Sequence, residues 1–253
     1  MNPFTIAAVV FICTFGGAMV GMGLRAVLPQ HHVSDATKET IQLCIGLVAM
    51  MTALVLGLLM ASAKDGFDEM KKTVEQTAVD LLTLDRTLAR YGPETAPIRA
   101  DLKHLLGVKI STVWPERPTE AIKLDPTVSK DGFEGVVHAM RTLAPANAVQ
   151  LQLQSLAVRT GETLLSMRWV AASEDASSMP LPFLLSLMFW LTITFTSFGL
   201  FAPRHGTVIA ALLLCSASVA IAVLLTLEMD RPLDGLIKVS PTSLHYAYAH
   251  MGT

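Results

Sequence analysis

Two adjacent histidines, His31 and His32, are the residues of this chain best suited by type to metal chemistry. Imidazole nitrogens are common ligands of transition metals, but a stable site needs further ligands at suitable spacing. Only Asp35 lies close to the pair in the sequence, and no cysteine or glutamate adds a ligand. A polar loop therefore explains the two histidines better than a metal site does, and the sequence establishes no metal ligand.

The sequence also lacks the motifs of the common catalytic sites. It contains no His-Glu-x-x-His, no Gly-x-Ser-x-Gly, no phosphate-binding loop and no paired cysteines. His104 and His138 stand in different helical segments without an evident acid or base partner, and Cys13, Cys44 and Cys215 lie inside apolar segments that favour packing. We therefore expect a protein that is not an enzyme.

The hydrophobic composition is concentrated in four windows without a charged side chain. Of the 253 residues, 52% are hydrophobic and 16% are charged, and the net charge of −2 gives no sign of nucleic-acid binding. Each window has about 20 residues, the length that spans a hydrocarbon core. The sequence predicts an all-α polytopic membrane protein in contact with the lipid bilayer. The windows are Phe4–Leu24, Ile41–Ala63, Leu181–Ala202 and Gly206–Leu227.

The second window continues into a charged but still periodic segment. Positions 67, 70, 74, 77, 81, 84, 88 and 91 are Phe, Met, Val, Thr, Leu, Leu, Leu and Tyr. Steps of three and four are typical of a helix that packs along its length against other helices. We predict one nearly continuous helix over Ile41–Tyr91, roughly 75 Å long at 1.5 Å per residue, with Gly66 as its weak point.

The region that follows predicts a helical insertion rather than a β domain. It holds 14 of the 19 lysines and arginines. Gly92 and Pro93 end the long helix, and further helical segments follow, the last with Val149, Leu153, Leu156, Leu164 and Met167 expected to face inward. A short helix is expected over Leu244 to Met251. The predicted division has four parts: membrane helices one and two over 1–63, a cytoplasmic helical region over 64–178, membrane helices three and four over 179–230, and a tail over 231–253.

Small and hydroxyl-bearing residues indicate how the spans pack. Gly17 and Gly21 have the spacing that lets two membrane helices approach closely. Span two has a second small-residue face, suited to packing on span one or on another subunit. Span three is rich in hydroxyl groups, which either bond to helix backbones or line a wet path. The face of span two consists of Ala49, Ala53, Gly57 and Ala61, and the hydroxyls of span three are Ser186, Thr192, Thr194, Thr196 and Ser197.

The basic residues predict the orientation. With a 2+2 arrangement of spans, the termini and the insertion share one side, and that side carries 16 of the 19 lysines and arginines. The positive-inside rule then places both termini in the cytoplasm. We expect the protein to lie in the inner membrane. His31 and His32 fall outside and the acidic residues after span four fall inside, so they cannot form one metal site.

Several motifs together resemble the bestrophin-like family of bacterial membrane proteins, a domain of unknown function that is distantly similar to the bestrophin anion channels. The first lies at the end of the long helix and the next is Trp114; the tail adds Glu228-x-Asp230-Arg231-Pro232 and Gly235-Leu236-Ile237. The resemblance covers nearly the whole chain. The residues of the first motif are Asp85, Arg86, Arg90, Tyr91, Gly92, Pro93 and Glu94.

This resemblance implies a homo-oligomeric channel for inorganic anions with two spans, a cytosolic helical insertion and two more spans. It also implies a candidate cation site, with calcium as the ion, at Glu228, Asp230 and Asp234, although the chain lacks the longer acidic run of true bestrophins. No other cofactor is expected.

Two functions remain open at this point. In the channel hypothesis span two lines a central pore, with Leu56, Leu59 and Met60 as an apolar constriction. Arg25, Lys64, Arg86 and Arg90 would supply positive potential at its entrances, although Arg86 and Arg90 could equally pair with Glu94 at the helix corner. The alternative is a non-conducting scaffold or sensor whose cytoplasmic helices bind a partner.

Overall fold

The computed structural model describes residues 2–27, 35–114, 132–174, 181–233 and 235–252. Every regular element in these ranges is helical, which confirms the all-α prediction, and no strand occurs among them. The helices are α1 (Pro3–Val27), α2 (Asp35–Tyr91), the short 3-10 helix η2 (Pro93–Thr95), α3 (Ala96–Val113), α4 (Gly132–Arg141), α5 (Ala148–Glu174), α6 (Leu181–Phe201), α7 (Gly206–Met229) and α8 (Thr242–His250).

The long helix predicted around the second apolar window is present as α2. It has 57 residues and begins at Asp35, six residues before the predicted start. It continues through Gly66, where a Cβ would have no heavy atom of the described residues within 4 Å. The helix is about 85 Å long at 1.5 Å per residue.

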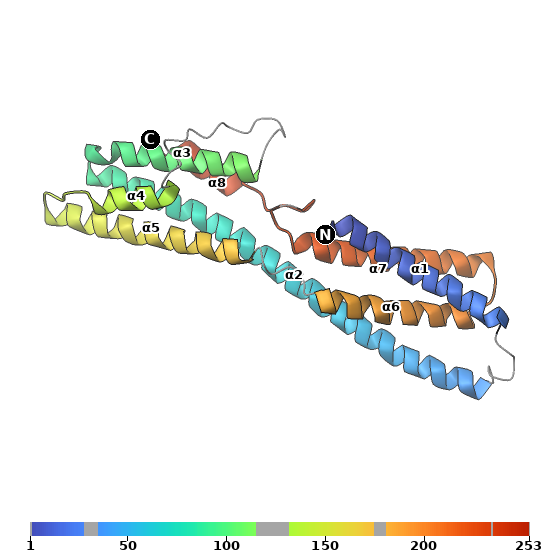
Figure 1. The fold of residues 1–253 in the computed structure, drawn as a ribbon. Helices are drawn as coiled ribbons and strands as arrows, with labels where there is room; N and C mark the ends of the chain where they lie inside the picture. Colours follow the sequence, from blue (N-terminus) through green and yellow to red (C-terminus); the bar gives the residue numbers. More distant parts are fainter. Residues whose placement is uncertain (1, 28–34, 115–131, 175–180, 234, 253) are drawn as a thin grey trace. The chain divides into compact units, whose positions relative to one another are not determined.

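The chain divides into two compact units. The first comprises Met1–Phe67 and Ser178–Ile237, and the second comprises Asp68–Ser177 and Lys238–Thr253. The first unit holds the four helices of the described residues that are long and apolar enough to cross a membrane, which are α1, the first half of α2, α6 and α7. In this unit α1 packs along both α6 and α7 (Figure 1).

Glycines bring α1 and α6 into backbone contact. A Cβ on Gly21 would lie 1.9 Å from the carbonyl oxygen of Thr196, and a Cβ on Gly199 would lie 1.9 Å from that of Ala18. Gly17 likewise faces Thr192 and Thr196. These distances confirm that the Gly17–Gly21 spacing serves close helix packing.

The hydroxyl groups of α6 bond to their own helix. Thr192, Thr194 and Thr196 each donate to the carbonyl oxygen four residues earlier, at 2.7 to 2.8 Å. Ser186 does the same at 2.9 Å. Such bonds satisfy polar groups inside an apolar environment, so they support packing rather than a wet path.

Two arginines join the ends of α1 and α6–α7. Arg25 donates to the carbonyl oxygen of Ala202, and Arg204 donates to that of Met22 at 2.8 Å. The carbonyl of Ala202 lies just past the end of α6, where backbone oxygens lack a partner within the helix, and that of Met22 lies five residues before the end of α1. The two bonds hold the turn between α6 and α7 against the last turns of α1.

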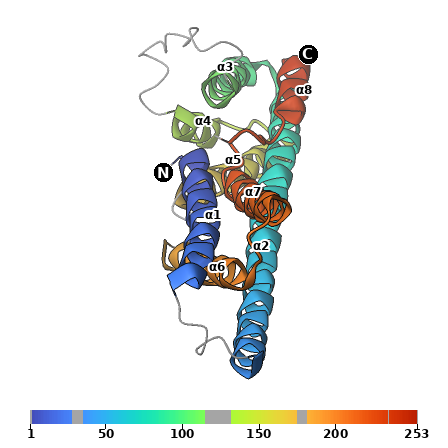
Figure 2. The ribbon, with the colours of Figure 1, turned by 90° about the vertical axis from the view of Figure 1, so that its right-hand side faces the viewer.

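The second unit is built on the apolar seam of α2. Val74, Leu81, Leu84, Leu88 and Tyr91 are buried, as the heptad spacing predicts. The α3 helix packs against α4 and α8, and α4 packs against α5 (Figure 2). The predicted helix near the C-terminal end is present as α8, and Leu244, Ala247 and Met251 are buried there.

The predicted inward face of α5 is partly wrong. Leu164 is buried, but Val149 and Leu156 are 65% and 47% exposed. The helix instead turns Gly161 toward α4, where a Cβ would lie 2.8 Å from the Cε of Met140. Small residues permit a closer helix contact than leucines do, and this contact sets the rotation of α5. The side chain of Met167 lies outside the described residues.

Candidate functional site

The membrane half of α2 is the least covered of the four apolar helices. Only 6% of its most apolar stretch is buried within the chain, against 33% for α1 and α6 and 22% for α7. Five large apolar side chains on this helix are each more than 60% exposed. They are Leu43, Leu47, Met50, Leu54 and Leu58.

One stripe of this uncovered surface runs along α2 at alternating steps of four and three. A Cβ on Gly46 or Gly57 would meet no heavy atom of the described residues within 4 Å. Met50 is 74% exposed and Met60 is 37% exposed. The stripe consists of Gly46, Met50, Ala53, Gly57, Met60 and Lys64, all of them exposed. We call it the small-residue stripe.

The three residues predicted to line a pore occupy different sides of α2. Leu56 and Leu59 pack against the apolar core of α1, α6 and α7. Met60 lies on the small-residue stripe. Whether any of the three lines a pore stays a prediction.

A buried ion pair joins α2 to α3 in the second unit. The Asp85 side chain is 2% exposed, and its two oxygens accept from Nε and Nη2 of Arg99 at 2.8 and 2.9 Å. The N–H of Gly252 donates to the same carboxylate at 3.2 Å. The hydrogen bond to Asp85 raises the pKa of Arg99 above its usual range, so the contribution of this cation is lost only at strongly alkaline pH.

The segment that follows the first unit is bound to α3 near this ion pair. Lys103 donates from Nζ to the carbonyl oxygen of Met251 at 2.7 Å and lies 5.3 Å from the ring centroid of Tyr248. Trp114 donates from Nε1 to the carbonyl oxygen of Val239 at 2.8 Å. Two hydrogen bonds therefore connect α3 to residues that follow α7. Lys103 contacts Met251, 148 positions later, and Trp114 contacts Val239, 125 positions later.

The corner after α2 depends on Gly92 and Thr95. Gly92 has φ 149°, a backbone conformation that other residues rarely adopt. Thr95 is fully buried, and its hydroxyl donates to the carbonyl oxygens of Leu88 and Gly92 at 2.6 and 2.8 Å. The hydroxyl therefore satisfies a carbonyl that the helix end leaves open. Gln150 adds a bond from its Nε2 to the carbonyl oxygen of Tyr91 at 2.9 Å.

Replacing Gly92 by alanine is expected to destabilise the protein by about 1–3 kcal/mol, because a residue with a Cβ is strained at this φ. The measurement is the apparent melting temperature of the full chain in detergent, followed by circular dichroism. Gly66→Ala is the control, since it lies inside α2 with open space around it. It should melt at the temperature of the unmodified protein or slightly above. Equal losses in the two variants would contradict the role of Gly92.

The other residues of the corner motif separate into buried and exposed ones. Tyr91 is buried, whereas Arg86, Arg90 and Glu94 are exposed. Among the described residues neither arginine forms an ion pair with Glu94. Within the motif, Asp85 is the residue that forms an ion pair, and its partner is Arg99. The sequence did not indicate Arg99, because it is one of many arginines on predicted helix surfaces.

Of the three residues of the candidate cation site, Glu228 is bound within the chain. It is 4% exposed, and its carboxylate accepts a hydrogen bond from the N–H of Leu236. Gly235 packs against the same carboxylate. Asp230 is partly exposed, and Asp234 lies outside the described residues. The geometry thus gives Glu228 the task of holding the turn after α7, while the cation site itself stays a prediction.

No other group in the described part of the chain is arranged for metal chemistry. Within those residues no three histidine, cysteine, aspartate or glutamate side chains come together. His31 and His32 lie outside the described ranges, and Cys13, Cys44 and Cys215 are free thiols. The arrangement that remains is an apolar membrane unit with one uncovered helix and a helical unit closed by a buried ion pair.

A comparison with family models identifies a relationship. The model of the Bestrophin-like domain matches residues 12–244, which include most of both units. No curated protein matches the chain significantly, and no solved structure does. The match extends over more than nine tenths of the 253 residues. The chain is therefore a membrane protein that belongs to the bestrophin-like family.

Proposed function

We propose that the protein is an anion channel formed by several copies of the chain, with α2 facing a shared path. The observation that carries the proposal is the uncovered membrane half of α2, of which 6% is buried within the chain. Helices of polytopic proteins associate by packing against one another. An apolar helix that its own chain leaves uncovered is thus suited to face other subunits around a shared path.

The small-residue stripe supports a path along α2. It contains no charged side chain until Lys64, so an ion would cross a narrow apolar passage of the kind that gates by dewetting. Glycine and alanine in the stripe leave the passage open at positions where a leucine would fill it, whereas Met50 and Met60 narrow it. Lys64 at the end of the stripe, together with the exposed Arg86 and Arg90 further along α2, favours anions over cations.

In this proposal the second unit lies in the cytoplasm, and both termini face the same side of the membrane. The positive-inside rule supports that placement, because Arg25, Lys38 and Arg204 are the only three basic residues that it leaves on the opposite side. The proposal places the protein in the inner membrane.

Anion flux into liposomes tests the channel. Purified protein in vesicles should carry chloride, and Gly57→Trp should lower the flux at least tenfold because the indole fills the stripe. Leu185→Trp is the matched control, since Leu185 is 55% exposed on α6 and lies on no part of α2. We expect its flux to match that of the unmodified protein. Absence of flux across voltage, pH and calcium concentration would refute the channel.

A second function is favoured by the second unit. A groove of about 420 Å³ lies between α2 and α8, and α5 exposes Val149, Leu151 and Leu156. Exposed apolar surface of this kind suits a scaffold or sensor that binds a protein partner. The groove is lined by Glu75, Ala78, Val79, Leu82, Thr242, Ser243 and Tyr246. The alternative would be supported if the protein carries no anions in liposomes but binds a protein partner through the second unit.

A further inference from the structure

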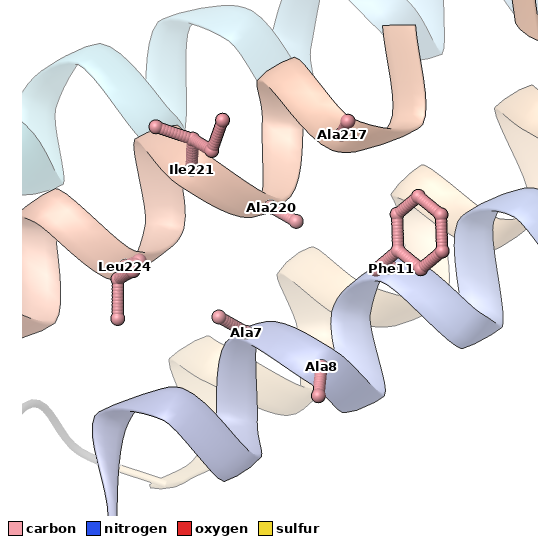
Figure 3. Close-up of a pocket in the computed structure, with 7 residues that line it drawn as sticks. All are labelled: Ala7, Ala8, Phe11, Ala217, Ala220, Ile221 and Leu224. Atoms are coloured by element: carbon pink, nitrogen blue, oxygen red, sulfur yellow. The ribbon is translucent and has the colours of Figure 1, made fainter. Parts of the chain in front are cut away.

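An apolar groove runs between α1 and α7 on the first unit. Its volume is about 300 Å³ and its lining is almost entirely apolar. Ala7 and Ala220 point toward each other across the gap, and Phe11 and Leu224 stand toward its two ends (Figure 3). The lining residues are Ala7, Ala8, Phe11, Ala217, Ala220, Ile221 and Leu224. Four of the seven are alanines, and their short side chains leave the groove open.

The uncovered face of α2 has the opposite shape. Beside the small-residue stripe it carries Leu47, Met51, Leu54 and Leu58, spaced by four, three and four residues. Leu54 and Leu58 are 65% and 62% exposed. Large side chains at this spacing project as a row of knobs from one side of a helix.

The groove and the row of knobs match in depth as well as in shape. The groove starts four residues after the beginning of α1 and ends five residues before the end of α7. The α2 helix runs back across the unit from the far end of α1 (Figure 1). The apolar part of α2 ends at position 63. The same number of residues, counted back from there along the helix, reaches Met51, Leu54 and Leu58, which therefore lie at the depth of the groove.

We propose that Leu54 and Leu58 of one copy seat in the α1–α7 groove of the next copy. The two surfaces are different parts of the same chain, so the contact is heterologous and repeats around a ring when the rotation closes. This inference rests on the self-association in the proposed function and assigns its contact. The leucine row then faces the neighbouring copy, and the small-residue stripe beside it remains turned toward the path.

Three observations favour a second copy over a lipid chain in the groove. The knobs and the groove lie at one depth, both lack charge, and the α2 face is the least covered apolar surface of the unit. Lipid chains need no small residues on a helix, whereas the four alanines that line the groove leave room for the side chains of another helix to approach. The close contact of Gly21 and Gly199 with backbone shows that this chain uses small residues in that way between α1 and α6.

Cysteine crosslinking between differently tagged copies tests the contact. The background replaces Cys13, Cys44 and Cys215 by alanine, and membranes that contain Leu58→Cys copies and Ala8→Cys copies are oxidised. Disulfides form only when the Cα atoms lie within about 7 Å. We expect a crosslinked dimer of the two tags at least tenfold above the level for Leu58→Cys with Leu185→Cys, because Leu185 is exposed on α6, away from the groove.

A second measurement uses the oligomer itself. Ala8→Trp fills the groove from an exposed position, so it should shift the detergent-solubilised protein toward single copies, whereas Leu185→Trp on α6 should leave its mass unchanged. Crosslinks of Leu58→Cys with itself in place of Ala8→Cys, or no crosslink with an unchanged mass for Ala8→Trp, would overturn the inference. Flux is measured separately: a protein that crosslinks but does not conduct refutes the channel and keeps the contact.

Discussion

Replacement of Arg99 by methionine is expected to lower the free energy of unfolding by about 3–5 kcal/mol, the usual cost of removing one partner of a buried ion pair. Asp85 would remain buried with a charge, and the N–H of Gly252 would be its one partner among the described residues. Methionine has a similar length, so the loss reflects the charge and the two hydrogen bonds rather than an empty space. The apparent melting temperature of the full chain in detergent, at one fixed heating rate, measures the effect.

Arg90→Met provides the control for this experiment. Arg90 is exposed on the same corner, and a surface change of this kind alters stability by about 0.5 kcal/mol or less. Adding Asp85→Asn to Arg99→Met should restore part of the lost melting temperature, because the double variant removes the unpaired buried charge at position 85. Indistinguishable melting of Arg99→Met and Arg90→Met would show that the ion pair does not stabilise the second unit.

The second large effect is expected from adding one methyl group to α1. Gly21→Ala places a Cβ where the carbonyl oxygen of Thr196 lies 1.9 Å away, so α1 and α6 must move apart. Overpacking of this kind costs about 1–3 kcal/mol and occasionally more. Here the obstacle is backbone and cannot rotate away, so we expect the upper end of that range and a lower yield of folded protein.

Gly16→Ala is the matched control, five positions earlier on the same helix. No heavy atom of the described residues lies within 4 Å of a Cβ there. Alanine is the better helix former by about 1 kcal/mol, so this variant should be as stable as the parent or more so. Yield and size-exclusion profile in detergent compare the two. If both alanines are tolerated equally, the close contact between α1 and α6 is not required for folding.

Local periodicity was enough to predict the helices, because it depends only on neighbours along the chain. The seam of α2 at Val74, Leu81, Leu84 and Leu88 is buried as its spacing predicts. The close contact at Gly17 and Gly21 could be predicted equally well, because glycines at this spacing mark close contacts between membrane helices.

Contacts across a turn could not be predicted in the same way. Asp85 and Arg99 meet because the corner at Gly92 folds α3 back along α2, and the identity of the partner depends on that geometry. The rotation of α5 was wrong for a related reason. Leucines mark an apolar face, but the closest helix contact was made by Gly161, which carries no hydrophobic signal of its own.

The hydrogen bond from Gly252 to Asp85 also links the folding of the second unit to the synthesis of the last two apolar helices. The second unit contains Val239, Leu244, Ala247 and Met251, which are buried in it and follow α7 in the chain. A ribosome releases these residues only after α6 and α7 have been synthesised. The second unit therefore acquires its last buried residues only after α1, α2, α6 and α7 have all been made.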